Sequence, residues 1–280
     1  MQIPVRGVCI FSVFMYKERS EFKDMSILKK IIMAAAPLPK IEEMESFLFI
    51  GPHPDDIEIG AGATAAKLAA EGKKICFLIC TDGRFGTSNS PDISPEDMIG
   101  IRKCESIASA ASLGIEDVRF LDLSDGGFYD KDELVRGIAA VAGEFKPDVI
   151  IAPDPSVTSE CHKDHLNAGR AAREIAVFAP YAGIMREYGA ESAPVKALAY
   201  YFTAKANSFV DTSGYLTAQL DSVFKHHLSQ FPEGCSDAKS ISLYLKLRAY
   251  DFGLRSFHKT AEGFRVLGQT HMHCLPEAGD

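Results

Sequence analysis

The sequence contains no CxxC pair, no internal repeat, no cluster of basic side chains and no long apolar run. A membrane-spanning helix needs about 20 consecutive apolar residues, so the last absence argues against a membrane protein. Nucleic-acid binding requires a basic surface, whereas Lys and Arg are scattered here and the formal net charge is −8. The odd total of seven cysteines, with no CxxC pair, favours reduced and mostly buried thiols in a cytoplasmic protein.

An apolar segment at residues 8–16 resembles a weak signal sequence. No small-residue cleavage site follows it, and charged residues 17–19 come directly after, so we expect no secretion signal. Residues 1–40 are instead expected to be an N-terminal extension, or to include an over-long start upstream of Met25. Because α/β sheets commonly use this chain length as one unit, residues 41–280 are predicted to form a single domain.

From residue 46 onward, short apolar runs alternate with amphipathic segments, which is typical of βαβ units. The predicted strands lie near 46–51, 74–80, 117–121 and 148–152, and the helices near 60–71, 98–113, 132–145 and 165–178. Beyond Pro194 we expect strands at 196–203 and 207–211 and helices at 216–228 and 239–256. The predicted fold is therefore a Rossmann-like, doubly wound, mostly parallel α/β sheet with C-terminal additions.

Two polar turns follow predicted strands of this sheet. His53, Asp55 and Asp56 come directly after one strand, and His162 and His165 follow another. The carboxyl ends of parallel strands share one edge of a sheet, so the two turns are expected to meet there. Catalytic zinc takes three nitrogen or oxygen ligands and keeps one position open, which His53, Asp56 and His165 satisfy. The sequence therefore predicts a zinc site.

Three further residues complete the chemistry of amide hydrolysis. Asp55 is the expected general base, because attack of water on an amide releases a proton. Protonated His162 is the expected donor to the oxyanion, and Asp164 is expected to keep that imidazole charged and oriented. Each motif alone has a plain structural explanation: Asp-Asp caps helices, and His-x-x-His often lies on a helix surface. Their joint placement at strand ends favours metal chemistry.

The order of these motifs resembles the PIG-L/LmbE-like zinc N-deacetylase family, from about residue 47 to 267. The matching segments are 51–56, the glycines at 60 and 62 with Thr64, 81–83 and 162–165. Segments 50–56, 152–155 and 262–265 are most similar to the diacetylchitobiose deacetylases within it. The chain departs from the family pattern at Ile57, where glutamate is frequent, and at Lys163, where proline is frequent.

The resemblance implies one Zn²⁺ per chain on the same three ligands, Asp55 as base and His162 as oxyanion donor. It adds Arg102 and Asp125 as residues that line the sugar site. It also adds His273, a C-terminal histidine that approaches the active site in an oligomer, so a homo-oligomer, trimer or hexamer, is expected.

The resulting prediction is hydrolysis of the N-acetyl group of a GlcNAc-type sugar, such as diacetylchitobiose, to acetate and a free amine. One alternative keeps the chemistry but takes another N-acetylglucosaminyl conjugate, such as GlcNAc-malate. Another is a nucleotide-binding module without catalysis that uses the Gly-rich turn. For Gly60 and Gly62, however, close packing of helix and strand is the simpler interpretation, because a full GxGxxG fingerprint is missing.

Overall fold

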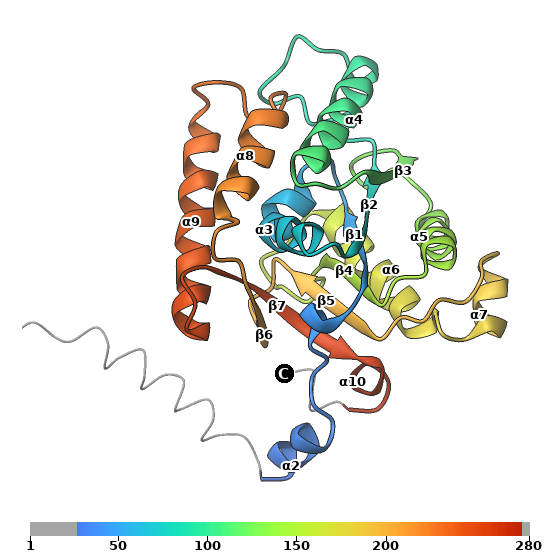
Figure 1. The fold of residues 1–280 in the computed structure, drawn as a ribbon. Helices are drawn as coiled ribbons and strands as arrows, with labels where there is room; N and C mark the ends of the chain where they lie inside the picture. Colours follow the sequence, from blue (N-terminus) through green and yellow to red (C-terminus); the bar gives the residue numbers. More distant parts are fainter. Residues whose placement is uncertain (1–26, 276–280) are drawn as a thin grey trace, which may run out of the picture.

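The computed structural model describes residues 27–275 (Figure 1). The apolar segment 8–16 and the question of a start at Met25 therefore lie outside the described residues. Within the predicted extension, the structure has a short helix α2 (Ile27–Ala35), and a 3₁₀ turn η1 (Ile41–Glu43) leads into the first strand. The assignment of 41–280 to one domain stays a prediction.

The described residues form a seven-stranded sheet in the order β3-β2-β1-β4-β5-β7-β6. The strands are β1 (Ser46–Gly51), β2 (Lys74–Thr81), β3 (Asp117–Leu123), β4 (Val149–Pro153), β5 (Ala197–Tyr201), β6 (Ser208–Asp211) and β7 (Ala261–Gly268). Strands β1 to β5 pair in parallel, and β7 pairs antiparallel with both β5 and β6. Strand β1 therefore lies beside β4, which places the two polar turns next to each other.

Helices cover both faces of the sheet (Figure 1). They are α3 (Asp56–Ala70), α4 (Pro95–Ser112), α5 (Lys131–Phe145), α6 (Lys163–Phe178), α7 (Ala182–Glu187), α8 (Leu216–His226), α9 (Ser236–Ser256) and α10 (Gln269–His273). In Figure 1, α3, α4, α8 and α9 lie to one side of the sheet, and α5, α6 and α7 to the other. The predicted doubly wound α/β fold is confirmed.

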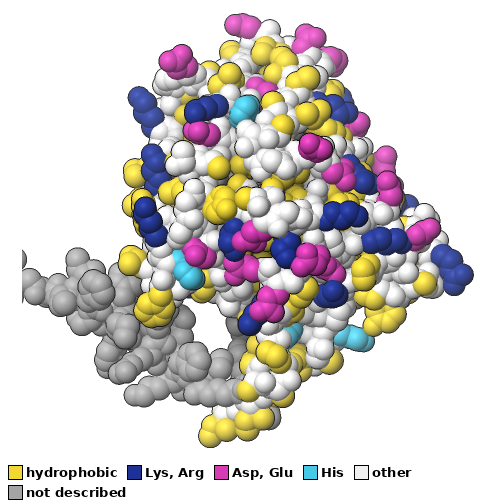
Figure 2. Space-filling view, viewed as in Figure 1, with side chains coloured by type: hydrophobic (Ala, Val, Ile, Leu, Met, Phe, Trp, Pro, Cys, Tyr) yellow, Lys and Arg dark blue, Asp and Glu magenta, His cyan; other side chains and the backbone are white. Residues whose placement is uncertain are grey.

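The hydrophobic core consists of two layers, one on each face of the sheet. Side chains alternate along β1, so Phe47 and Phe49 enter the layer beneath α3, whereas Leu48 and Ile50 enter the layer beneath α5 and α6. Every one of these four side chains is fully buried. No helix in the described part of the chain combines the length and apolar character needed to cross a membrane. On the face shown in Figure 2, basic and acidic side chains are intermixed.

Most of the cysteine thiols were expected to be buried, and this expectation is wrong. Cys76 and Cys80 are buried in β2, but Cys104, Cys161 and Cys274 are exposed. The strand run that holds Cys76 and Cys80 was recognisable from its apolar neighbours. The other cysteines among residues 27–275 lie in helices or loops, where burial depends on contacts distant in sequence.

Strand β7 was not predicted. Its sequence carries Glu262 and Arg265, which break the apolar pattern that marks a buried strand, yet both side chains are buried. Glu262 is satisfied there by the backbone N–H groups of Ala63 and Thr64 and by the Gln219 amide. Polar partners from other elements thus make a charged residue compatible with the interior.

Close helix–strand packing at Gly60 is confirmed. A Cβ atom built on Gly60 would lie 2.2 Å from Cδ2 of Tyr201 in β5, so no side chain fits between α3 and that strand. Helix α3 begins at Asp56, four residues before the predicted start, and Ala61 has a non-helical φ of −151° within it. The early start makes Asp56 the first helical residue, directly beside the turn that contains His53.

Candidate metal centre

The first polar turn connects β1 to α3 in a strained backbone conformation. Asp55 is the N-cap of α3 and has φ 126°, a value that non-glycine residues rarely adopt. The buried Arg102 guanidinium holds this turn by donating to Asp55 Oδ2 at 3.1 Å and to Pro54 O at 2.5 Å. It also donates to Gly83 O at 3.1 Å, on the neighbouring loop. Arg102 therefore fixes where the Asp55 carboxylate lies.

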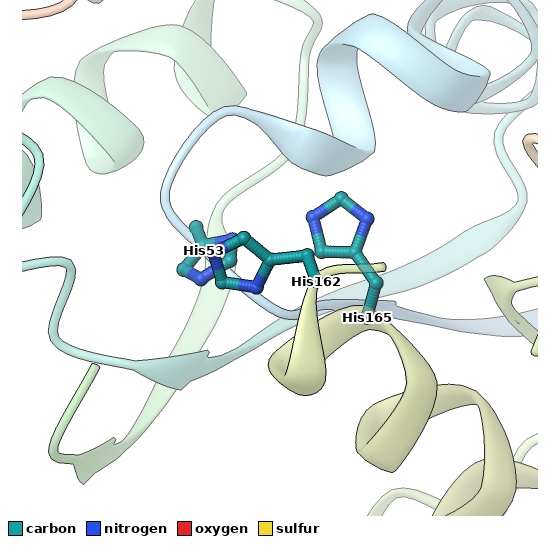
Figure 3. Close-up of side chains that lie close together, drawn as sticks. All are labelled: His53, His162 and His165. Carbon is teal, nitrogen blue, oxygen red and sulfur yellow. The ribbon is translucent and has the colours of Figure 1, made fainter. Parts of the chain in front are cut away.

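The second polar turn precedes α6, beyond the end of β4. His162 is the N-cap of α6, and its Nδ1 accepts a hydrogen bond from the backbone N–H of Asp164 at 3.3 Å. His165 lies in the first turn of the same helix. Figure 3 shows the imidazoles of His162 and His165 reaching from this helix toward His53 on the loop after β1. The three residues offer ring nitrogens within 4.8 Å of one another, so the predicted convergence of the two turns is present.

The Asp56 carboxylate lies between two of these imidazoles. Its Oδ2 is 3.0 Å from His53 Nδ1, and its Oδ1 is 3.3 Å from His165 Nε2. The far nitrogen of each ring faces other carboxylates: His53 Nε2 is 3.1 Å from Asp164 Oδ2, and His165 Nδ1 is 2.9 Å from Glu160 Oε2. Histidines that bind metals characteristically donate their other N–H to a carboxylate. His53, Asp56 and His165 therefore fit a divalent metal ion.

His162 is a further candidate ligand. Two groups of described residues have ligand atoms that all lie within 4.8 Å of one another, His53, His162 and His165, and His53, Asp125, His162 and Asp164, and the predicted set with Asp56 is not one of them. Its environment differs from that of the other two histidines. The side chain of His162 is 47% exposed, its Nδ1 is taken by the Asp164 N–H, and the Asp164 carboxylate oxygen is 3.7 Å away. His162 thus lacks the carboxylate contact that orients the rings of His53 and His165.

The charges around His53 and His165 stabilise positive charge at this position. Burial lowers the pKa of His53, but hydrogen bonds with Asp125, Asp164 and Asp56 outweigh it and raise that pKa well above its usual value. Burial likewise lowers the pKa of His165, and Asp56 raises it to about 9. For Asp56, burial raises the pKa, but His165 and His53 bring it well below its usual value. A bound dication supplies the same positive charge in place of the two imidazole protons.

Asp55 has a different electrostatic environment from its neighbour Asp56. Burial raises its pKa, the Arg102 guanidinium lowers it and the Asp56 carboxylate raises it, and the result is a pKa of about 6. A carboxylate with a pKa near neutrality can both take up and release a proton at neutral pH. This property suits the predicted role as general base.

The environments of Asp164 and His162 differ from the predicted ones. Asp164 Oδ2 contacts His53 Nε2 and the Gly126 N–H, at 3.1 and 2.8 Å, and lies farther from His162. Burial lowers the pKa of His162, and the neighbouring His53 and His165 lower it further. The structure therefore favours a neutral His162 whose Nδ1 is an acceptor, so that its Nε2 carries the proton.

Of the three residues added by resemblance, Asp125 and Arg102 lie at the centre and His273 does not. Asp125 Oδ1 is 3.2 Å from His53 Nε2. Arg102 is only 3% exposed, and its contacts are with the Asp55 turn and Gly83. His273 is exposed on α10 and lines a separate cavity, so within one chain it is not part of the metal centre.

Glu160 is the residue of this centre that the sequence did not reveal. Its Oε2 contacts His165 Nδ1, and its Oε1 accepts from the His162 backbone N–H at 2.7 Å. One carboxylate thus connects both histidines of the second turn. An acidic residue two positions before His162 was the available signal.

A buried ion pair lies behind the first turn. His227, just after α8, places Nε2 3.1 Å from Glu58 Oε1, and both side chains are fully enclosed. Burial raises the pKa of Glu58, but His227 outweighs it and the pKa is lowered, so the carboxylate is ionised. Glu58 follows the atypical Ile57 of the motif and packs α3 against the end of α8.

A cavity of about 440 Å³ opens beside the metal centre. His165 and Glu160 line one part of it, and Tyr244 and Arg248 of α9 line another. The Phe202 ring also lines it and stacks on His165, with ring centroids 6.1 Å apart and an interplanar angle of 11°. A ligand in this cavity therefore meets aromatic faces next to His165, which the sequence predicts to be a metal ligand.

A doubly wound sheet with a His/Asp metal site and a nearby base at its carboxyl edge is typical of a metal-dependent hydrolase. Known proteins resemble the chain over most of its length. The family described as PIG-L, GlcNAc-PI de-N-acetylase, matches residues 48–176. The diacetylchitobiose deacetylase of Thermococcus kodakarensis is 33% identical over 239 residues, 84% of this chain and 88% of that protein.

Two further relatives resemble the chain to different extents. A 1D-myo-inositol 2-acetamido-2-deoxy-alpha-D-glucopyranoside deacetylase of a Nocardioides species is 30% identical over 52% of this chain and 58% of its own length. The N,N'-diacetylchitobiose deacetylase of Pyrococcus horikoshii, solved with its inhibitor MPG, has a TM-score of 0.76 and 26% identity. It covers 97% of this chain and 98% of its own.

The chain therefore belongs to the PIG-L family of N-deacetylases. This membership confirms the family, the LmbE-like fold and the enzyme class that the sequence predicted.

Proposed function

We propose that this chain removes the N-acetyl group of a GlcNAc-type sugar by zinc-dependent hydrolysis, releasing acetate and a free amine. The observation that carries the proposal is the Asp56 carboxylate between His53 Nδ1 and His165 Nε2, with Asp55 in the adjacent position. These three residues would hold one Zn²⁺ per chain, which when bound would act as a Lewis acid toward the amide carbonyl and lower the pKa of a water molecule to about 7.

Asp55 accepts the proton that water loses as it adds to the amide carbonyl. Arg102 keeps the carboxylate in place through its contacts with Asp55 Oδ2 and Pro54 O. Because the pKa of Asp55 is about 6, the same group can then release the proton to the departing nitrogen as the C–N bond breaks. One carboxyl group thereby serves both halves of the hydrolysis.

His162 donates a hydrogen bond to the oxyanion that forms at the carbonyl oxygen. The Asp164 N–H bond to its Nδ1 leaves the Nε2–H group available as the donor. Its greater exposure, compared with His53, suits a group that contacts substrate. The role of Asp164 is indirect: its carboxylate orients His53, and its backbone N–H sets the tautomer of His162.

For the substrate, we favour diacetylchitobiose or a GlcNAc-like sugar. The Thermococcus kodakarensis relative named for diacetylchitobiose supports this choice, and its similarity extends over 84% of the chain. Deacetylation of another N-acetylglucosaminyl conjugate, such as GlcNAc-malate, is the second candidate, supported by the relative named for a GlcNAc-inositol substrate. Substrate contacts by Arg102, Asp125 and His273 stay predictions.

The nucleotide-binding alternative has lost its structural basis. Gly60 lies within α3 and is needed for the close contact with Tyr201, so it is part of a helix and not of a loop. A cytoplasmic location is also proposed, and the six described cysteines, all free, are consistent with a reducing compartment.

We further propose a homo-oligomer in which α9 packs against a second copy of the chain. Its outer face exposes an apolar stripe with the 4-3-4 spacing of helix-pairing residues, Leu243, Leu247, Tyr250 and Leu254, and the exposed Phe257 follows directly after the helix. Light scattering of Leu247→Lys should show a smaller assembly than the unchanged protein. An unaltered mass would argue that another surface forms the oligomer.

The proposed function is tested by metal analysis together with acetate release from a panel of N-acetylated mono- and disaccharides. The unchanged protein should contain about one zinc per chain, as expected for a three-ligand site. His165→Ala should lose both the zinc and the activity, whereas His258→Ala, at an exposed histidine outside the centre, should keep both. Stoichiometric zinc in His165→Ala, or no acetate from any sugar, would refute the proposal.

A further inference from the structure

The cavity of about 440 Å³ beside the metal centre has walls to which the deacetylation chemistry assigns no role. One wall is the segment after β5, with Phe202 and Thr203, and another is α9, with Tyr244 and Arg248. His165 lines the same cavity. The volume lies within the range of about 300–1,000 Å³ that is typical of small-molecule sites. The cavity therefore has room for a part of the substrate that lies next to the acetylated group.

The Phe202 ring is held at this cavity by a strained backbone. Its φ is 52°, in the left-handed region that bulky residues rarely adopt. The ring stacks on His165 and meets the buried Tyr201 ring edge-on, with centroids 4.8 Å apart and an interplanar angle of 76°. Backbone strain of this kind is common at ligand-binding positions, where the surroundings hold it. Phe202 is partly exposed, so part of its ring is open to a ligand beside His165.

Tyr244 and Arg248 lie one turn apart on α9 and contact each other. Arg248 Nη1 donates to the Tyr244 hydroxyl at 3.2 Å, and the guanidinium carbon lies 5.1 Å from the centroid of the Phe252 ring. These contacts fix the position of the guanidinium group. A guanidinium has five N–H groups, so the bond to Tyr244 leaves donors for a ligand. Tyr244 is 51% exposed and adds a second aromatic face to the cavity.

The charges at the cavity offset each other. Among the described residues that line it, Glu160 is the only carboxylate and Arg248 the only guanidinium. An uncharged ligand with apolar faces and hydroxyl groups suits a lining of aromatic rings and a few fixed donors. A pyranose ring has both properties, because its C–H groups form apolar faces and its hydroxyl groups lie around the edge. The lining therefore fits a sugar ring.

We propose that Phe202, Tyr244 and Arg248 bind the second ring of a disaccharide substrate and make the enzyme prefer a disaccharide to GlcNAc alone. The inference rests on the proposed deacetylation, with the N-acetylated ring at the metal centre and the next ring in the cavity. Arg248 donates to a hydroxyl group of that ring, and the two aromatic rings contact its C–H faces. Because Glu160 offsets Arg248, the cavity gives the anionic part of GlcNAc-malate no net attraction. Diacetylchitobiose is therefore the better fit of the two candidate substrates.

The test compares kcat/KM for diacetylchitobiose and for GlcNAc in the zinc-loaded full chain. Arg248→Ala should lower the value for the disaccharide about tenfold or more, mainly through KM, because it removes a charge-assisted hydrogen bond made only with the second ring. Tyr244→Ala should lower it by a smaller factor, and both variants should leave the value for GlcNAc unchanged. Lys246→Ala is the matched control: it removes an exposed cation of the same helix that does not line the cavity, and should change neither value.

Loss of the disaccharide preference in Arg248→Ala and Tyr244→Ala, with zinc content and assembly mass unchanged, would support the inference. Disaccharide kinetics equal to those of Lys246→Ala would place the second ring elsewhere, and equal losses on both sugars would mean that α9 acts on the metal centre instead. Turnover of GlcNAc-malate that exceeds that of diacetylchitobiose and falls in Arg248→Ala would show that the cavity binds an anion. Each of these three results would overturn the inference.

Failure of the proposed function is recognised separately, because neither sugar would then release acetate. In that case, calorimetric titration of the zinc-loaded protein with diacetylchitobiose tests the cavity by itself. A weaker affinity in Arg248→Ala than in Lys246→Ala would support the site for the second ring, and equal affinities would overturn it.

Discussion

The two turns that meet at the metal centre differ in how far they are shielded from solvent. The turn after β1 is buried at His53, Asp55 and Asp56. The turn before α6 is more open: the side chains of His162 and Glu160 are 47% and 24% exposed. A buried carboxylate is retained only where cations or donors compensate it, so the first turn is built to hold charge. In the proposed function, the second turn supplies His165 to the metal site and His162 to the substrate.

The largest effect on turnover is expected from a substitution of Asp55 in the first turn. Asp55→Asn should lower deacetylation about 10²–10⁴-fold, because it removes the base but keeps a residue that tolerates positive φ. Zinc content should stay near that of the unchanged protein, since no ligand is altered. Asp122→Asn is the matched control, because Asp122 also has positive φ but is exposed and pairs with Lys103 instead of a residue of the centre. Full activity in Asp55→Asn would assign the base to another residue.

In the second turn, a substitution at His162 should lower catalysis and leave the metal content unchanged. His162→Ala should lower kcat about 10²–10³-fold, the effect of removing one oxyanion donor, with zinc content preserved. Loss of zinc in this variant would mean that His162 is a ligand and would favour the three-histidine group instead. Measuring zinc and kcat in the same preparation therefore distinguishes the two ligand sets.

Glu160 should have a smaller effect, on metal affinity. Its carboxylate orients His165, and loss of such a partner typically weakens metal binding or activity about 10–100-fold. We expect Glu160→Ala to lose zinc to a competing chelator at lower concentrations, and Glu160→Gln to retain part of the affinity, because an amide oxygen can still accept from His165 Nδ1. If the two variants behave alike and both match the unchanged protein, Glu160 does not position His165.

The residues of this centre that the sequence predicts are placed by the order of the strands. Those that it does not predict are placed by loops or by contacts between segments distant in sequence. His53 and Asp56 follow β1 directly, and His165 lies at the start of α6, after the loop that follows β4. The rule that parallel strands share a carboxyl edge was sufficient to bring them together. Glu160 depends on the path of the loop before α6, which no local pattern specifies. The pairing of Glu58 with His227 joins segments 169 positions apart, so the sequence around either residue carries no sign of it.

Strand β7 shows the same limit within the fold. The parallel strands β1, β2 and β4 are continuous apolar runs, and all were predicted. Glu262 and Arg265 interrupt the pattern of β7, and their burial depends on partners from α3, α8 and the loop after β4. Local patterns therefore identify elements that are buried by apolar contacts alone and miss those whose charges are neutralised by distant residues.

The pH profile gives the smallest and most specific contrast between the two turns. Asp55 must be ionised to accept a proton, so activity is present above its pKa and declines as the pH falls through it. The pKa of Asp55 is about 6, and a bound dication lowers it further. kcat/KM should therefore begin to decline at pH 6 or lower and fall about tenfold for each further pH unit. The residual activity of Asp55→Asn should lack this limb, whereas that of His162→Ala should retain it. Zinc content must be followed at each pH, because protonation of His165 also releases metal at low pH. An acidic limb of the same position in Asp55→Asn, with zinc retained, would show that the titrating group belongs to the more exposed second turn.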